Sequence, residues 1–196
     1  MFQVDRKKSS KDPTTASDKR KKTVTRTFRI SREWDEVLRE DAERQGISVN
    51  VLINLILHRY ANFDRLCRNR NFICMSKRTF RKVIEGMPSE HLALAGEHTG
   101  SEDVQKTIDM LGLPSNYDSF TYLVKKHYGG ADCAMWFNCF LHSLTKHDLF
   151  HLQHDLGREW SVFLEKYLLS YLKSLKIDYE TKIYDFAVNI RVPRPY

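Results

Sequence analysis

Residues 23–60 read TVTRTFRISREWDEVLREDAERQGISVNVLINLILHRY, and the pattern in this stretch decides how the N-terminal part of the chain folds. The stretch opens with a short run in which apolar and polar side chains alternate, as in a strand with one buried face. Phe28 and Ile30 lie on one side of the run, and Thr25, Thr27 and Arg29 lie on the other. A strand this short needs a pairing partner, because even an isolated pair of strands is barely stable in water.

Two helices are expected after the strand. Apolar residues recur at three- and four-residue spacing from Trp34 to Ala42, which predicts an amphipathic helix. Gly46 is expected to end this helix in the left-handed conformation, and Ser48 offers a hydroxyl to cap a second helix. One strand and two small helices leave too much apolar surface uncovered for a monomer. We therefore expect two copies of the chain to pair their strands into one antiparallel ribbon.

The order strand, helix, Gly-Ile-Ser turn and helix resembles the ribbon-helix-helix family of DNA-binding proteins (the MetJ/Arc/CopG superfamily) over about forty residues. The resemblance is carried by Thr27-Phe28-Arg29-Ile30, Trp34, Leu38, Ala42, Gly46-Ile47-Ser48, Leu52-Ile53, Leu57 and Tyr60. It implies an obligate homodimer whose two-stranded ribbon enters the major groove of double-stranded DNA. It also implies a prokaryotic source.

The resemblance assigns roles by position. Thr25, Thr27 and Arg29 would contact bases, and Arg29 could read guanine with two donors. Phosphate contacts would come from Arg26 and from the start of the second helix, at Ser48, Val49 and Asn50. The dimer core would contain Phe28, Ile30, Trp34, Leu38, Leu52, Ile53, Ile56 and Tyr60.

Four residues depart from the family pattern, and one of them is Ser31, which stands where Pro is common although Ser is also a good helix cap. Arg26 lies on the inward side of the strand, where an apolar residue is usual, and Val51 and Leu55 are apolar where charged residues are usual. The second helix is therefore apolar nearly all round, which suggests that a further surface covers it, such as the C-terminal domain. A plainer interpretation also stands, in which a charged strand and two amphipathic helices simply begin an α+β domain and Arg29 is solvated.

The charge is concentrated beside this module. The net charge is +7, and residues 1–22 hold eight Lys and Arg against three Asp. Residues 65–82 hold seven more basic residues and no acidic one. Two basic segments thus flank the module and would attract phosphate whatever the DNA sequence. Four cysteines without a CxxC pair, no signal peptide and no membrane-length apolar run predict a cytoplasmic protein without a membrane partner.

Four segments are expected along the chain. Residues 1–22 form a disordered basic arm, 23–63 the DNA-binding and dimerisation domain, 64–82 a basic linker with the first elements of the next domain, and 83–196 an α+β sensor or oligomerisation domain. Its sheet should be small and mostly antiparallel. The expected helices are 77–85, 102–111 capped by Ser101, 119–128, and 157–176 capped by Asp155. The expected strands are 72–75, 134–143, 149–154 and 184–192.

Histidine and cysteine gather on the predicted hairpin 134–154. If the turn of this hairpin lies at 145–148, His142 is opposite His151 and Cys139 is opposite His154. Imidazole and thiolate are ligands of transition metals. His142 and His151 could therefore bind a metal ion, or they could be an ordinary pair of half-buried histidines. No other cofactor is expected. The sequence has no Gly-rich phosphate loop, HExxH motif or paired carboxylates on one helix face. No catalytic residue is predicted, and the protein is not expected to be an enzyme.

The leading hypothesis is therefore a sequence-specific, DNA-binding transcriptional regulator that acts as a homodimer. One alternative is an antitoxin that neutralises a toxin through its C-terminal part. Another is a repressor whose C-terminal domain senses a metal or small-molecule effector.

Overall fold

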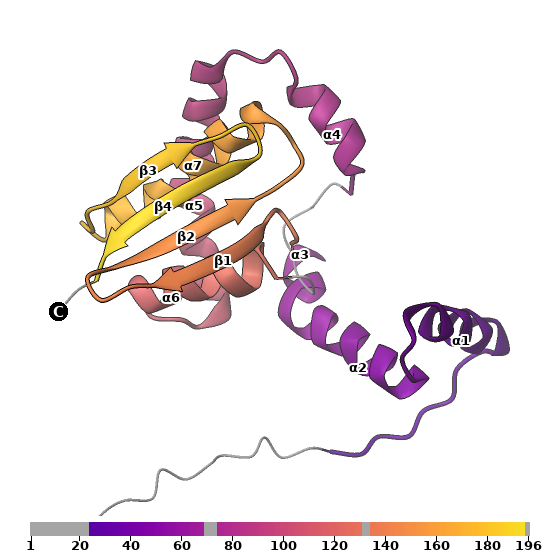
Figure 1. The fold of residues 1–196 in the computed structure, drawn as a ribbon. Coiled ribbons are helices and arrows are strands. Elements are labelled where there is room, and N and C mark those ends of the chain that lie inside the picture. The colour runs from indigo at the N-terminus through magenta and orange to yellow at the C-terminus, as the bar shows by residue number, and fades with distance from the viewer. Residues whose placement is uncertain (1–23, 69–73, 131–133, 195–196) are drawn as a thin grey trace, which may run out of the picture.

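The computed structural model describes residues 24–68, 74–130 and 134–194, and Figure 1 shows how they are arranged. The arm predicted over residues 1–22 lies outside the described residues, and so does part of the strand predicted over 72–75; its described residues, 74 and 75, form no strand. The described chain has two parts: an N-terminal pair of helices and a larger α+β domain. The α+β class expected for the C-terminal part is confirmed.

The N-terminal part begins with an extended segment, residues 24–30, that belongs to no helix or strand. Helix α1 (Arg32–Gln45) follows, then α2 (Val49–Arg59), the π-helical turn η1 (Tyr60–Asp64) and α3 (Arg65–Arg68). Since α2, η1 and α3 succeed one another without a break, they form one rod that leads to the larger domain (Figure 1). The two predicted helices are confirmed. The ribbon needs a second chain and stays a prediction.

The larger domain is built on a four-stranded antiparallel sheet with the order β1-β2-β4-β3. Its strands are β1 (Asn138–Ser143), β2 (His147–Gln153), β3 (Glu180–Ile183) and β4 (Ala187–Pro193). The predicted final strand 184–192 is wrong in its first half, because the chain turns between β3 and β4 and Tyr184 donates its N–H to the Ala187 carbonyl, 2.8 Å away. Apolar and polar residues alternate from 184 to 192 without interruption at this turn, so the sequence pattern does not show where the turn lies.

Helices cover one face of the sheet. The helices that contact the strands are α7 (Arg158–Ser174) and α6 (Tyr117–Tyr122) with its π-helical continuation η2 (Leu123–Tyr128). Helices α5 (Ser89–Leu111) and α4 (Lys77–Ile84) pack against α7. Figure 1 shows the strands in front of α7, α5 and α6, with the opposite face of the sheet toward the viewer. Every inward side chain of β2 is buried, whereas the outward ones are half-buried or exposed. The sheet therefore has one covered face and one open face.

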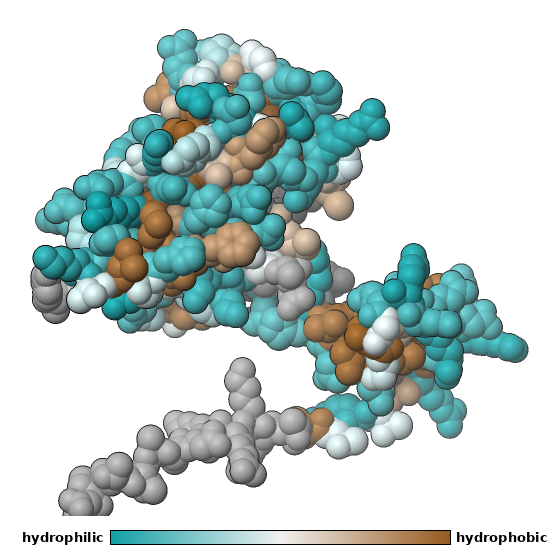
Figure 2. Space-filling model, in the orientation of Figure 1, coloured by the Kyte–Doolittle hydropathy of each residue, from teal (hydrophilic) through white to brown (hydrophobic). Residues whose placement is uncertain are grey.

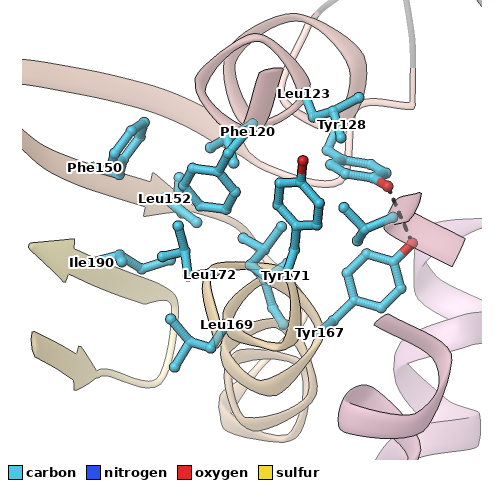
Figure 3. Close-up of a cluster of buried hydrophobic side chains, with 14 of the residues drawn as sticks. Phe120, Leu123, Tyr128, Phe150, Leu152, Tyr167, Leu169, Tyr171, Leu172 and Ile190 are labelled. Atoms are coloured by element: carbon cyan, nitrogen blue, oxygen red, sulfur yellow. Dashed lines mark hydrogen bonds between the residues drawn. The ribbon is translucent and has the colours of Figure 1, made fainter. Parts of the chain in front are cut away.

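The core fills the space between the covered face and the helices. Figure 3 shows rings from α6 and α7 meeting aliphatic side chains from the strands, and the hydroxyls of Tyr128 and Tyr167 share a hydrogen bond of 3.3 Å. Burying each such Phe or Leu side chain contributes roughly 1.5–3 kcal/mol. The largest fully buried side chains are Phe120, Phe150, Ile108, Leu123, Leu152, Leu164, Leu168, Leu172 and Ile190.

Helix α5 approaches α7 closely at two buried glycines, Gly96 and Gly100. A Cβ on Gly100 would overlap the Tyr167 carbonyl oxygen and come within 2.7 Å of the Tyr167 Cα. This contact explains one wrong boundary. A helix was expected to start at residue 102 with Ser101 as its cap, but α5 continues through Ser101 without a break. Gly100 is part of that helix because only a residue without a side chain fits against α7 there.

Asp155 does not cap α7. The helix begins after Gly157, whose φ of 91° favours a residue without a side chain. Asp155 instead receives the Lys77 ammonium of α4, with Nζ 3.2 Å from Oδ1. Phe80 of α4 packs edge-on against Trp160 of α7, so α4 belongs to the larger domain.

Candidate nucleic-acid interface

Three short-range signals fix the geometry of the N-terminal helices. The Ser31 hydroxyl accepts the Trp34 N–H at 3.4 Å and begins α1. Gly46 ends α1 with a φ of 65°, a conformation that costs glycine little. The Ser48 hydroxyl then accepts the Val51 N–H at 3.3 Å and begins α2. Both predicted caps of the Gly-Ile-Ser turn are confirmed.

Little of this helix pair is buried. Among residues 24–60, only Ala42 on α1 and Leu52 on α2 are fully buried, while Leu38 and Ile53 are half-buried. Helix formation alone does not stabilise segments of this length, since isolated helices shorter than about 12–15 residues are marginal in water. The pair therefore needs additional packing.

The apolar side chains that could supply this packing face solvent in the single chain. Of the 21 exposed large hydrophobic side chains in the described residues, ten lie between residues 24 and 60. Trp34 is 64% exposed and Ile56 is 48% exposed. Figure 2 shows apolar side chains gathered on this part of the molecule. The remaining predicted dimer-core residues that are exposed are Phe28, Ile30 and Tyr60.

Val51 and Leu55 are also exposed. The expectation that the C-terminal domain covers this side of the second helix is wrong, since both side chains stay exposed with that domain in place. Among the described residues, a ring contact between the two parts lies near the end of the rod. There, Phe63 of η1 lies against His127 of η2, with ring centroids 5.7 Å apart.

The residues expected to contact DNA lie on the extended segment before α1. Thr25, Arg26, Thr27 and Arg29 are all exposed, and residues 24–30 contain no acidic residue. Two acids of α1 are paired with arginines of the same helix: Asp35 receives Arg39 at 2.7 Å, and Glu36 receives Arg32 at 3.1 Å. Both pairs are exposed and neutralise these carboxylates only in part, so what favours the approach of an anion here is the absence of acid from residues 24–30.

The start of α2 meets the requirements of a phosphate contact. The first N–H groups of a helix have no partner within the helix, and the helix dipole favours negative charge there. Val49 and Asn50 supply such N–H groups, and α2 has no acidic residue in its first turn. The Ser48 hydroxyl accepts the Val51 N–H as the predicted cap, so the phosphate contact predicted for Ser48 would come from its backbone N–H.

The predicted histidine and cysteine pairing is wrong by two residues. His142 lies opposite Leu149, and His151 lies opposite Phe140, so the two histidines are diagonal neighbours on the open face. His151 Nδ1 is hydrogen-bonded to Asn189 Oδ1 at 2.7 Å. The described part of the chain contains no group of three or more His, Cys, Asp or Glu side chains that could hold a metal ion. Cys133 lies outside it.

The shift in register has a physical cause. Asp148 was assigned to the turn as a charged residue, but it lies inside β2 and is buried. Burial alone would raise the pKa of Asp148, yet hydrogen bonds from Ser143, Tyr117 and Arg194 outweigh it and lower that pKa. Tyr117 Oη lies 2.9 Å from Oδ2, and Arg194 Nε lies 3.0 Å from Oδ1. These partners satisfy the carboxylate within the strand, so the turn forms earlier.

Cys139 and His154 do not meet either. Cys139 pairs with Leu152, and burial raises the pKa of its thiol to about 11, so it is a poor nucleophile at neutral pH. His154 Nδ1 accepts the Leu156 N–H at 3.3 Å, which leaves the proton of the neutral ring on Nε2, 2.8 Å from the hydroxyl of the fully buried Ser161. A general base would need the opposite tautomer. The hydrogen bond between His154 and Ser161 therefore ties the end of β2 to the start of α7.

None of the described helices is both long and apolar enough to cross a membrane. Comparison of the chain with family models, with curated proteins and with solved structures finds no match.

Proposed function

We propose that the protein is a sequence-specific DNA-binding regulator that acts as a homodimer through residues 23–63. The observation that carries the proposal is the unpartnered apolar surface of α1 and α2, directly beside an acid-free extended segment. A second copy of the same helices is the partner best matched to this surface, because the same side chains would be covered in both copies.

Pairing of two copies also gives the extended segment a role. Residues 24–30 belong to no helix or strand, so a second strand could pair with their backbone, and an antiparallel pair would put Phe28 and Ile30 of both copies over the helices. Thr25, Thr27 and Arg29 would then project from the opposite side. A ribbon of two strands fits the major groove, where arginine can contact O6 and N7 of guanine together.

The start of α2 completes the interface. In a ribbon-helix-helix dimer the two α2 helices flank the ribbon, so the N–H groups of Val49 and Asn50 would meet phosphates on either side of it. Such contacts position the protein on the duplex, whereas the ribbon supplies the preference for particular bases. The chain from α4 to β4 folds into a domain with its own core, unlike the short C-terminal part, disordered alone, that is usual in antitoxins of this type.

The test starts from a pool of random duplexes about 30 base pairs long, from which the wild-type protein selects its preferred sequence. Arg29→Ala should lose roughly tenfold or more of its preference for the selected duplex over the random pool, because one bidentate base contact is worth about 1–3 kcal/mol of discrimination. Arg158→Ala is the matched control: it removes one exposed guanidinium from α7, far from the ribbon.

Two further results decide the proposal. Affinity for both duplexes should fall steeply between 50 and 200 mM salt, since each neutralised phosphate releases counterions, roughly one per contact. The selected sequence should be two-fold symmetric, to match a symmetric dimer. Failure to enrich any duplex, or an equal loss of preference in the two variants, would contradict the proposal.

A further inference from the structure

The open face of the sheet carries a second set of groups suited to a ligand. One row of side chains crosses all four strands in register on this face: Phe140 pairs with His151, His151 with Asn189, and Asn189 with Lys182. Neighbouring strands lie about 4.8 Å apart, so the row spans roughly 14 Å. In the view of Figure 2 the face is polar with isolated apolar side chains, unlike the apolar surface over α1 and α2.

The aromatic end of the row offers a flat surface. Phe140 is 49% exposed, and its ring lies 6.1 Å from that of His151 with an angle of 35° between the two planes. Aromatic side chains placed like this on an open sheet stack unpaired bases, because every base has a π-face whatever its hydrogen-bonding edge. The outward neighbours of Phe140 on β1 and β2 include His142, His151 and the half-buried Leu149, so a protein partner would find only a small apolar patch here.

The middle of the row offers one donor and one acceptor. Since Asn189 Oδ1 can only accept, Nδ1 of the neutral His151 carries the proton and donates it over 2.7 Å. Nε2 of His151 is then an acceptor, and the Asn189 amide nitrogen keeps its two N–H donors. A donor beside an acceptor matches the edge of a nucleobase, and the hydrogen bond between the two side chains holds them in place.

Cations lie at the far end of the row. Lys182 Nζ lies 5.2 Å from the centre of the Tyr184 ring, and Arg191 lies on the same face of the neighbouring strand. Among the outward residues of these four strands, Glu180 is the only carboxylate outside the turns, and it already accepts a hydrogen bond from Arg191 at 3.1 Å. The row thus runs from a stacking ring through hydrogen-bonding groups to positive charge.

We propose that this row, Phe140–His151–Asn189–Lys182, binds single-stranded nucleic acid, with a base stacked on Phe140 and the phosphate backbone near Lys182. This site is separate from the duplex interface proposed for residues 23–63 and does not depend on it, because it uses only residues of the sheet. Its ligand must expose an unpaired base, which double-stranded DNA does not.

The test measures binding of the full-length protein to fluorescein-labelled 12-nucleotide single strands of mixed sequence, both RNA and DNA, by fluorescence anisotropy. Phe140→Ala should weaken binding about tenfold, the effect typical of removing one stacking side chain. Phe140→Leu should weaken it similarly, because it keeps apolar volume without a ring. Leu144→Ala is the matched control, since Leu144 is 48% exposed and lies in the β1–β2 turn outside the row.

Arg29→Ala separates this proposal from the previous one: it should leave single-strand binding unchanged, whereas both Phe140 variants should leave duplex binding unchanged. Wild-type protein that binds no single strand at micromolar concentration would overturn the inference. So would equal losses in Phe140→Ala and Leu144→Ala, or full binding by Phe140→Leu. A fall in molecular mass on Phe140→Ala would instead identify the face as a contact between copies, and would also overturn it.

Discussion

Ile56→Asp tests whether α2 lies in a dimer interface. Ile56 is 48% exposed in the single chain. Fully burying an isoleucine contributes roughly 1.5–3 kcal/mol, so covering its remaining half is worth about 1 kcal/mol in each protomer. An aspartate loses this contribution and leaves a desolvated carboxylate without a partner, at a cost of at least about 1 kcal/mol more. A symmetric interface contains the residue twice. The dimer should therefore weaken by at least about 4 kcal/mol, roughly a thousandfold in its dissociation constant.

The assay is sedimentation equilibrium of the wild type and two variants from low to high micromolar concentration. Val83→Asp is the matched control, because Val83 is a 60% exposed aliphatic residue on α4, outside the N-terminal helices. The wild type and Val83→Asp should both have the mass of a dimer, and Ile56→Asp the mass of a monomer. Circular dichroism should still report a folded α+β domain in Ile56→Asp, but with less helix than in the other two, because residues 24–60 would fold only as the dimer forms.

Two results would refute the reasoning. A wild type that stays monomeric at high micromolar concentration would mean that the apolar surface of α1 and α2 is not covered by a second copy. An Ile56→Asp variant that dimerises as tightly as Val83→Asp would mean that the interface lies elsewhere on the chain.

Two further predictions concern the larger domain. Burial lowers the pKa of His154 to about 4, against about 6.5 in an unfolded chain, so the unfolded state binds a proton first as the pH falls. The free energy of unfolding should drop between pH 6.5 and 4 by up to about 3 kcal/mol. Denaturant titrations of the wild type and His154→Gln should show a smaller drop in the variant, and equal drops would contradict the assignment. Gly100→Ala should destabilise the protein by roughly 1–3 kcal/mol despite its better helix propensity, because the added methyl group overlaps the backbone of α7. Ser101→Ala, one residue along on the exposed side, is its control, and a Gly100→Ala variant at least as stable as that control would show that α5 can move away from α7.

Short-range signals predicted the N-terminal helices well. Ser31, Gly46 and Ser48 act on backbone groups within a few residues of themselves, so their effect can be read from local sequence. The helix predicted over 77–85 is likewise found, as α4 over Lys77–Ile84, and its cap Ser76, which was not predicted, also acts within a few residues of itself. The function of these elements is harder to predict, because it depends on what covers the apolar surface, and the covering element is not close in sequence.

The errors arose where distant residues decide the local structure. Asp148 belongs to a strand because Tyr117 and Arg194 satisfy its carboxylate, and both are more than 30 residues away. The open-face row could not be predicted either. β4 lies between β2 and β3 in the sheet, so Asn189 becomes a neighbour of both His151 and Lys182 only once the strand order is known. Alternation shows which residues share a face, but strand order decides which of them touch.

The distribution of buried side chains would link the proposed dimer to folding of the N-terminal part. Both clusters of buried hydrophobic residues in the described chain lie between residues 84 and 192. The larger domain therefore completes its core without α1 or α2, whereas α1 and α2 together bury only Ala42 and Leu52. One small contact cannot offset the entropy of ordering about 30 residues, so these helices need stabilisation beyond the contacts of the described residues. In the proposed homodimer a second copy would supply it, and dimerisation and folding of residues 24–60 would be one equilibrium. The binding-competent fraction should then rise with protein concentration and with added DNA.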